Sequence, residues 1–432
     1  MLDVPRLILL ILRGHKHALQ ISLNKFFSGI GKALKVPTAS AYCQARQKLK
    51  PEVFEHLTNY VCENFYRFYE RDGLVQRWRG RRLVACDGTY LNLPDNEETR
   101  AEFFLQTNQY EGVEAVQALT CVLYDLLNGL ALCATLGTRT GESMPLLEQL
   151  WEKTKPGDIL ILDRGYADYR VLASAVAASG RDVVIRLPKN GFKEAQPLFI
   201  KGEGIPTEKI VELKCPKKAR KYVREHELPE SLRVRFIRVE LEEGEVEVLA
   251  TTLLDSEQHP ASEFKWLYGK RWGEETFFDR IKNIFEVERF SGTSPVAIRQ
   301  DYYGVLFLAT LESVFAASDQ RALIEKSRQR QQQREAKEEA SQTGTVTEVV
   351  PTKRQVTEPQ VNHAISYVAL LDRVVELLLG NDSAEKILEE MHHLFRTSPT
   401  RVRPGRSFER KPEHKHRAER LRYHKYGKKI IA

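Results

Sequence analysis

The chain has 432 residues, of which 42% are hydrophobic and 29% are charged. This length allows two or three domains, and the composition is typical of a folded globular protein. The six cysteines are scattered without a CxxC pair, which argues against a zinc knuckle and a secreted disulfide framework. The apolar run 7–12 is too short to cross a membrane and lacks a signal-peptide cleavage site. We therefore expect a cytoplasmic protein without a membrane partner.

The formal net charge of +7 is unevenly distributed. Residues 401–432 contain 12 Lys or Arg and 3 Glu, a net charge of +9, so the rest of the chain carries −2. Tyr and His side chains are interleaved with these cations. Such a tail is typical of segments that bind DNA phosphates, because the bound cations release counterions. A disordered tail that only aids solubility is the alternative interpretation.

Residues 1–80 predict several short helices, with a break at 37–40 before a helix at 41–49. Basic residues gather around this break. If the region is a small helical DNA-binding domain, Arg46 and Lys48 are expected to contact DNA. A charged solvent-exposed face on a helical bundle is an equally good interpretation.

From Arg82 onward the pattern changes to short apolar runs that predict five strands. The five runs are 83–86, 116–123, 130–136, 159–162 and 183–187. Amphipathic segments at 144–153 and 169–178 predict helices between the later strands. Three consecutive strands followed by alternating helix and strand is the order of the ribonuclease H fold, a mixed sheet flanked by helices. We therefore predict an α/β catalytic domain at 81–300.

The second half of the chain predicts an insertion in this domain and further helices. Alternating runs follow a turn signal at 188–191 and predict an antiparallel β unit inserted at 189–260. Helical periodicity resumes at Ser262 and breaks once, at 291–295. The remaining predicted parts are a helical extension at 301–339, a linker at 340–358, and a last helix with the basic tail at 359–432.

Two aspartates stand at the ends of predicted strands. Asp87 follows the apolar run 84–86, and Asp163 follows 159–162. Either aspartate alone is more often a turn or helix-cap residue. The first and fourth strands of a ribonuclease H sheet are neighbours, however, so we expect the two carboxylates to meet. A divalent cation would compensate their charge.

A third carboxylate follows from helical geometry. At about 100° per residue, Tyr268, Arg271, Glu275 and Lys282 fall within an arc of roughly 60° on one continuous helix. Glu274 is the obvious rival, but it lies about 100° from Glu275. A solvated face with i, i+4 ion pairs is the plain alternative. Aromatic and aliphatic residues crowd the same helix and predict that it is packed: Trp266, Trp272, Phe277, Phe278, Ile281 and Phe285.

The spacing Tyr, two residues, Arg, three residues, Glu, six residues, Lys resembles the YREK signature of bacterial transposases of the insertion sequence 4 family. The Asp-Gly-Thr that begins at Asp87 and the Asp-Arg-Gly-Tyr that begins at Asp163 are similar to the same family, as is the segment 42–49. The resemblance covers most of residues 35–300 and, weakly, the tail at 403–410.

The resemblance implies a DNA transposase that cuts DNA at transposon ends and joins them to target DNA by a cut-and-paste route. It implies that Asp87, Asp163 and Glu275 are catalytic and bind two Mg²⁺ ions, for which Mn²⁺ can substitute. Arg271 and Lys282 would hold DNA phosphates, and Tyr268 would contact the same strand. The implied partners are the repeats at the transposon ends and the target DNA, bound by a homodimer without a nucleotide cofactor.

In related enzymes the inserted β unit helps to form a hairpin at the transposon end, with a flipped base stacked on an aromatic side chain. No Trp lies between Trp151 and Trp266, so this stacking residue is unassigned. The candidates are Phe192, Phe199, Tyr222 and Phe236. Two other functions remain open: a two-metal, structure-specific endonuclease of the same fold, and a domesticated DNA-binding protein that has lost catalysis.

Overall fold

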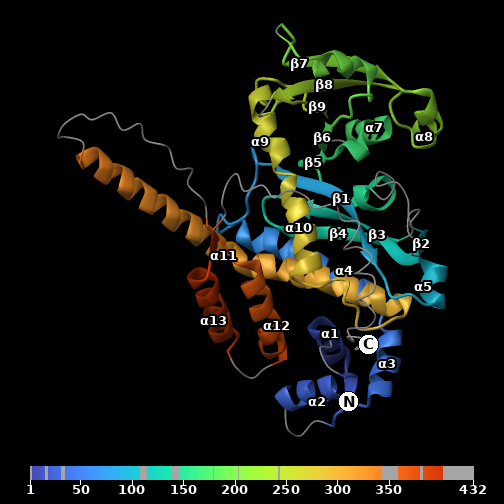
Figure 1. Cartoon of the computed structure of the whole chain (residues 1–432), viewed down its shortest axis with the longest axis vertical. Helices are drawn as coiled ribbons and strands as arrows, with labels where there is room; N and C mark the ends of the chain where they lie inside the picture. The colour runs from blue at the N-terminus through green and yellow to red at the C-terminus, as the bar shows by residue number, and fades with distance from the viewer. Residues whose placement is uncertain are drawn as a thin grey trace. The chain divides into compact units, whose positions relative to one another are not determined.

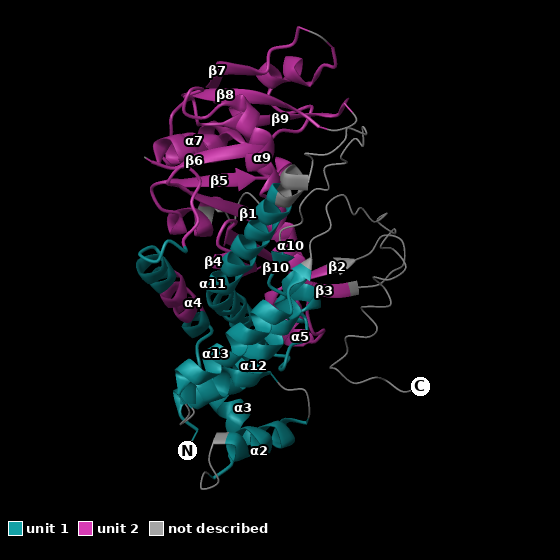
Figure 2. Cartoon of the chain, turned by 90° about the vertical axis from the view of Figure 1, so that its left-hand side faces the viewer, with its two compact units in different colours: residues 1–54, 63–74, 280–432 teal, residues 55–62, 75–279 magenta. Residues whose placement is uncertain are grey.

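The computed structural model forms two compact units. Unit 1 comprises residues 1–54, 63–74 and 280–432, and unit 2 comprises residues 55–62 and 75–279 (Figure 2). The structure describes residues 2–14, 18–30, 35–107, 114–137, 146–178, 180–202, 204–241, 244–341, 359–379 and 383–401. The predicted basic tail and most of the predicted linker therefore lie outside the described residues.

Unit 2 is built on a mixed sheet (Figure 1). Its strands are β1 (Arg82–Asn92), β2 (Phe104–Thr107), β3 (Glu114–Asp125), β4 (Leu130–Gly137), β5 (Asp158–Leu162), β6 (Asp182–Arg186), β7 (Glu208–Lys214), β8 (Ser231–Glu240) and β9 (Val246–Thr251). Within the described residues these nine strands form one sheet in the order β2-β3-β1-β5-β6-β9-β8-β7, and β4 also pairs with β3.

The strand directions confirm the predicted mixed sheet. β1 pairs in parallel with β5, and β5 pairs in parallel with β6. The β1–β3, β3–β4, β7–β8 and β8–β9 pairs are antiparallel. All five predicted strands are present, and the first and fourth of them, β1 and β5, are neighbours as expected.

The structure also departs from the predicted elements. β1 continues to Asn92, six residues beyond the apolar run, because β3 pairs with it along this length. The inserted β unit is antiparallel as predicted, but it extends the central sheet because β9 pairs with β6. The described part of the predicted helix at 144–153 is a π turn, Leu146–Leu150, followed by a 3-10 turn, Trp151–Lys153.

Helices and 3-10 turns cover the sheet of unit 2. They are α5 (Glu97–Glu102), Arg164–Tyr166, α7 (Tyr169–Ala177), Lys193–Phe199, Lys217–Ala219, α8 (Arg220–Glu225), Ala261–Glu263 and α9 (Phe264–Gly269), and α10 (Trp272–Asn283) continues into unit 1. Phe264, Leu267 and Tyr268 of α9 pack on a core face that includes Ile161 and Leu249. Every residue of β5 is buried, which indicates that both faces of the sheet are covered there.

Unit 1 is helical. Its elements are α1 (Val4–Arg13), α2 (Leu19–Ile30), α3 (Ala39–Lys48), the π turn Phe65–Tyr69, α11 (Pro295–Ser341), β10 (Pro359–Gln360), α12 (His363–Leu379), α13 (Ala384–Thr397) and β11 (Thr400–Arg401), and α4 (Glu52–Asn64) begins in this unit. The predicted short amino-terminal helices are therefore confirmed. The interruption predicted at 291–295 is also confirmed, since α11 begins at Pro295.

The apolar run near the amino terminus forms a buried helix. Asp3 caps α1 by accepting a hydrogen bond from the Arg6 backbone, and Leu9 and Leu10 are buried. A Cβ at Gly304 of α11 would lie 3.3 Å from Cδ2 of Leu12, so α1 and α11 approach closely here. None of the helices in the described residues has the length and apolar character that a membrane span requires.

The linear domain boundaries remain predictions. Unit 1 groups the amino-terminal helices with α11, α12 and α13, although these segments are far apart in the sequence. α13 had no counterpart among the predicted elements.

Candidate active site

Asp87 and Asp163 lie side by side at the end of the parallel β1–β5 pair. The last paired residues of these strands are Cys86 and Leu162. Asp87 and Asp163 are each the next residue along the chain, so the strand register places them at the same edge. The expectation that these two carboxylates meet is therefore supported by the backbone alone.

Local hydrogen bonds hold both side chains. Oδ1 of Asp87 accepts a hydrogen bond from the backbone N–H of Gly88 at 2.8 Å. Oδ1 of Asp163 accepts one from the backbone of Gly165 and so caps the 3-10 turn Arg164–Tyr166. Asp163 therefore has the helix-cap role that the sequence suggested. The cap uses only one of its two carboxylate oxygens, Oδ1.

The helix that carries the third carboxylate differs from the prediction. Tyr268 belongs to α9, Glu275 and Lys282 belong to α10, and Arg271 lies in the turn between the two helices. The four side chains therefore do not form a stripe on one continuous helix. Glu275 lies in the first turn of α10, and a third of its side chain is exposed.

The guanidinium of Arg271 joins two of the three carboxylates. Its Nη1 atom lies 3.2 Å from Oδ2 of Asp87, and its Nη2 atom pairs with Oε1 of Glu275. Only 9% of the Arg271 side chain is exposed. A planar guanidinium suits this arrangement because it donates along two directions at once.

The pKa of Asp87 shows that the three acids share one electrostatic environment. Burial raises this pKa above the ordinary Asp value, and the negative charges of Asp163 and Glu275 raise it further. The Gly88 N–H and Arg271 act in the opposite direction. Burial also lowers the pKa of Arg271, but Tyr268, Glu275 and Asp87 outweigh burial and raise it.

The donor chemistry at this edge fits a hard divalent cation. The three side chains offer only carboxylate oxygens, and their mutual repulsion favours a positive charge among them. In the parts of the chain that the structure describes, no three His, Cys, Asp or Glu side chains are placed so that they could together hold a metal ion. Arg271 instead provides positive charge between Asp87 and Glu275.

Glu274 is part of this site in a way that the sequence did not reveal. Its side chain is completely buried, and its Oε1 atom accepts a hydrogen bond from the backbone N–H of Asp87 at 3.0 Å. Helical spacing only indicated that Glu274 faces away from Glu275. The sequence around Glu274 is equally compatible with an exposed glutamate, so it does not indicate that this carboxylate is buried.

Tyr268 is mostly buried beside Arg271, whose Cζ atom lies 5.9 Å from the centre of the Tyr268 ring. Burial raises the pKa of Tyr268 to about 12, so its hydroxyl stays protonated at neutral pH. That hydroxyl is buried and makes no hydrogen bond within the described residues. Lys282 is half-buried on the last turn of α10, about two helical turns from Glu275.

The aromatic residues of α9 and α10 are only partly packed. Phe277, Phe278, Ile281 and Phe285 are buried as predicted. Trp266 and Trp272 of the same segment are 49% and 59% exposed. Helical periodicity places aromatic residues around an axis, but it does not show which side meets the core.

The candidates for stacking a flipped base differ in exposure. Phe236 is completely buried in β8 and presents no free face to a base. Phe192 and Phe199 are half-buried. Tyr222 is half-buried too, and its ring already stacks on His226 with centroids 3.9 Å apart.

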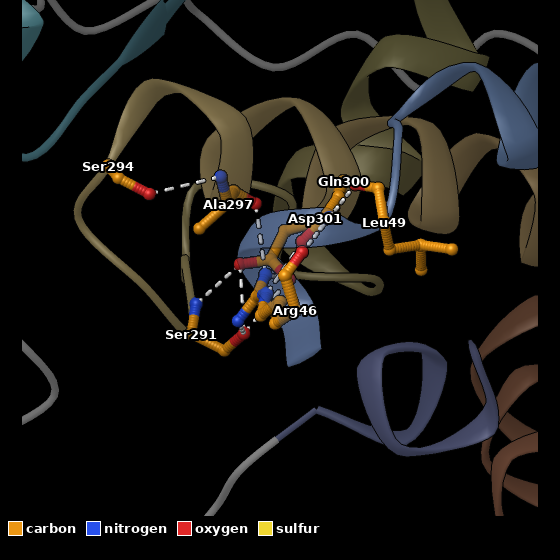
Figure 3. Close-up of polar contacts among 7 residues, drawn as sticks. All are labelled: Arg46, Leu49, Ser291, Ser294, Ala297, Gln300 and Asp301. Atoms are coloured by element: carbon orange, nitrogen blue, oxygen red, sulfur yellow. Dashed lines mark hydrogen bonds and ion pairs between the residues drawn. The ribbon is translucent and has the colours of Figure 1, made fainter. Parts of the chain in front are cut away.

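Arg46 is buried in unit 1, which does not fit the expected contact with DNA. Its side chain enters a polar cluster between α3 and the start of α11 (Figure 3). The guanidinium donates to Gln300 at 2.7 Å, to Ser291 at 2.7 Å and to the backbone oxygen of Ala297 at 3.0 Å, and it pairs with Asp301 at 2.6 Å. Every nitrogen of the guanidinium is therefore engaged by the protein.

Lys48, two residues further along α3, is exposed. Arg46 and Lys48 could not be separated by sequence because both are basic residues on one short helix. The burial of Arg46 is recognised only through its partners, Ser291 and Asp301, which lie some 250 positions away in the chain.

The family comparison covers the sheet, the three carboxylates and the start of α11. Residues 78–311 match the family described as "Transposase DDE domain", which is more than half of the chain. The chain belongs to this family. The predicted identity of the chain as a DDE transposase is thereby confirmed, and DDE transposases generally use divalent metal ions.

Two individual proteins also align with this chain. Transposase InsG for insertion sequence element IS4 of Escherichia coli (strain K12) is 28% identical over 276 residues, which are 63% of this chain. The match spans about 60% of the length of that relative. A cryo-EM structure of a piggyBac transposase synaptic complex with hairpin DNA aligns with 93% of this chain and 76% of its own, at a TM-score of 0.41 and 9% identity.

Proposed function

We propose that this chain is a DNA transposase that cleaves DNA at transposon ends and transfers the cut strand to target DNA. One observation carries the proposal. Asp87 and Asp163 are adjacent at the end of the β1–β5 pair, and the Arg271 guanidinium pairs with both Asp87 and Glu275. Family membership supports the same conclusion, since the matched region contains all three residues.

The core of unit 2 is assigned to the ribonuclease H-like class. The order β4-β3-β1-β5-β6, with the first three strands antiparallel and the last three parallel, supports this assignment. In such a sheet the ends of the parallel strands meet at one edge, which is where Asp87 and Asp163 lie.

Asp87, Asp163 and Glu275 would hold two Mg²⁺ ions, or Mn²⁺ in their place. Bound there, the ions would activate the attacking hydroxyl and stabilise the leaving 3′ oxygen of the phosphodiester. The protein contributes the placement of the acids, with Asp87 on β1, Asp163 directly after β5 and Glu275 on α10. Arg271 contributes positive charge that neutralises Asp87 and Glu275 when they are not otherwise compensated.

Arg271, Tyr268 and Lys282 would position the DNA strand. The Arg271 guanidinium can donate to a phosphate, and Lys282 can bind one as a point charge. Tyr268 would contact the same strand beside Arg271, and its hydroxyl, which remains protonated, adds no negative charge near the phosphates. The substrates would be the paired transposon ends and the target DNA, bound by a homodimer in the cytoplasm at the nucleoid, with a hairpin at the cleaved end.

Cleavage of a labelled duplex that bears the element's own ends tests the proposal. With Mg²⁺, the wild-type protein is expected to nick at the repeat boundary and to join the end to target DNA. Asp87→Ala, Asp163→Ala and Glu275→Ala are each expected to bind the duplex and fail to cut. Glu257→Ala, which removes an exposed carboxylate of unit 2, is the matched control and should cut normally.

The other outcomes identify the alternatives. Metal-dependent cleavage without strand joining, and without preference for the ends, would indicate a structure-specific endonuclease. Binding without any cleavage would indicate a DNA-binding protein that has lost catalysis. Cleavage that survives all three substitutions would remove these carboxylates from the mechanism.

A further inference from the structure

Asp87 occupies an unusual position in its strand. β1 continues beyond β5, and Asp87 is the first β1 residue after the last β1–β5 pair, Cys86 with Leu162. It still pairs with Val122 of β3 on the other side. The Asp87 backbone N–H donates to Oε1 of Glu274 at 3.0 Å, so a side chain supplies the acceptor where β5 has ended.

Glu274 is built into the protein interior. Its side chain is completely buried in the first turn of α10. Burying a polar side chain is unfavourable unless hydrogen bonds compensate it, and the Asp87 N–H supplies one to Glu274. The contact therefore stabilises one defined backbone position for Asp87.

The carboxylates of Glu274 and its neighbour Glu275 contact different groups of the site. Glu275 is partly exposed and its carboxylate meets Arg271, whereas Glu274 is directed at the main chain of Asp87. Two consecutive residues of α10 thus face the side chain and the backbone of the same site. The Glu274–Asp87 bond also fixes the distance between α10 and β1, the two elements that carry Asp87 and Glu275.

We propose that Glu274 is a positioning residue, whose buried carboxylate holds the Asp87 backbone so that the Asp87 side chain is oriented toward a divalent cation. The inference rests on the proposed function for the role of the cation. It predicts that the position of the acceptor oxygen matters and that the negative charge does not. A direct metal ligand would show the opposite dependence.

Three substitutions separate these roles. Glu274→Gln keeps an acceptor oxygen at the same reach without the charge. Glu274→Asp keeps the charge but shortens the side chain by one methylene. Glu274→Leu removes the acceptor and keeps an apolar side chain of comparable size in the buried site.

Hydrogen–deuterium exchange at the Asp87 amide in the metal-free, full-length protein is the first readout. Wild type and Glu274→Gln should exchange within about 3-fold of each other. The Asp and Leu variants should exchange at least about 10-fold faster, because the amide loses its acceptor. Equal exchange in wild type and the Leu variant would overturn the proposal, whatever the protein's activity.

Mn²⁺ binding, measured directly by calorimetry or electron paramagnetic resonance, is the second readout. The Asp and Leu variants should bind Mn²⁺ about 10- to 100-fold more weakly than wild type, and Glu274→Gln should bind within about 3-fold. Weak binding by the Gln variant alone would assign Glu274 as a charged ligand and overturn the positioning role. Unfolding temperatures of the variants are recorded alongside. If Glu274 had a purely structural role, its substitution would lower the unfolding temperature, and the Glu274→Gln variant would not recover the Mn²⁺ affinity of wild type.

The proposed function is judged separately. If the wild-type protein fails to cleave DNA but binds Mn²⁺ with the order of affinities above, the transposase proposal fails and the positioning role stands. If cleavage occurs and all Glu274 variants bind Mn²⁺ equally, the transposase proposal stands and the positioning role fails.

Discussion

The Nη1 atom of Arg271 lies 3.2 Å from Oδ2 of Asp87, while Nη2 of the same guanidinium pairs with Glu275. One mostly buried cation thus neutralises a carboxylate on β1 and another on α10. Removing it leaves two acids that repel each other in a partly buried site.

Arg271→Ala is expected to lower the free energy of unfolding in metal-free buffer by about 1–3 kcal/mol, because Asp87 and Glu275 lose their common partner. Millimolar Mg²⁺ should restore more stability to the variant than to wild type, since the cation replaces the lost positive charge. Denaturant unfolding with and without EDTA measures both quantities. Arg289→Ala, which removes an exposed arginine, is the control and should change stability by less than about 0.5 kcal/mol. A loss that Mg²⁺ leaves unchanged would contradict this interpretation.

Arg46 and Lys48 form a matched pair on α3, one buried and one exposed. Arg46→Ala leaves the buried carboxylate of Asp301 without its cation and should reduce stability by about 3–5 kcal/mol. Lys48→Ala should leave stability within about 0.5 kcal/mol of wild type. If Lys48 contacts a phosphate, its loss should reduce the slope of log affinity for DNA against log salt by about 1.

Thermal unfolding and salt titrations of both variants provide the comparison. The burial of Arg46 would be contradicted by an Arg46→Ala protein that melts like wild type but binds DNA with a reduced salt slope. An unchanged slope in a stable Lys48→Ala protein would remove α3 from the predicted DNA-binding surface.

His259 predicts a pH dependence of stability. Its ring is almost buried and stacks on Trp78, with centroids 5.4 Å apart. Burial lowers the pKa of His259, and the positive charges of Arg81 and Arg79 lower it further. The folded protein therefore binds this proton less tightly than the unfolded chain does. The stability contributed by neutral His259 is fully present above the ordinary His pKa and is lost as the pH falls through the lower, folded value.

The substitution His259→Phe keeps an aromatic ring against Trp78 and removes the titration. The melting temperature of wild type should fall more than that of the variant between about pH 7 and about pH 5, the range that spans the ordinary His pKa. His226→Phe is the control, because His226 also stacks on a ring but is exposed. It should fall as wild type does, and a parallel fall in all three proteins would show that His259 does not titrate in this range.

The sequence predicted the part of the site that depends on strand order. Asp87 and Asp163 each end an apolar run, and the order of strands and helices implied that β1 and β5 are neighbours. Both inferences use only local sequence patterns and a rule of sheet topology, so neither requires knowledge of how side chains pack. The register that sets Cys86 opposite Leu162 confirms them.

The rest of the site depends on packing, which periodicity does not encode. The turn at Arg271 breaks the helix between Tyr268 and Glu275, yet the spacing along the chain is compatible with one continuous helix. The burial of Glu274 and Arg46 depends on β1 and α11, partners distant in the sequence. A polar residue is predicted to be exposed unless its partner is known, so these two contacts could not be predicted from the sequence.

The basic tail at 401–432 gives the last prediction. Its net charge of +9 exceeds that of the whole chain, so its removal leaves a protein with a net charge of −2. If the tail binds DNA phosphates, a chain that ends at residue 400 should bind unrelated duplexes more weakly, and its salt slope should fall by about 0.9 for each lost phosphate contact. Preference for the transposon ends over other sequences should persist, because phosphate contacts carry little sequence information. Fluorescence anisotropy across a salt series, with end and scrambled duplexes, measures the slope and the preference together. An unchanged slope would show that the tail only aids solubility, and a lost preference with an unchanged slope would show that it reads bases instead.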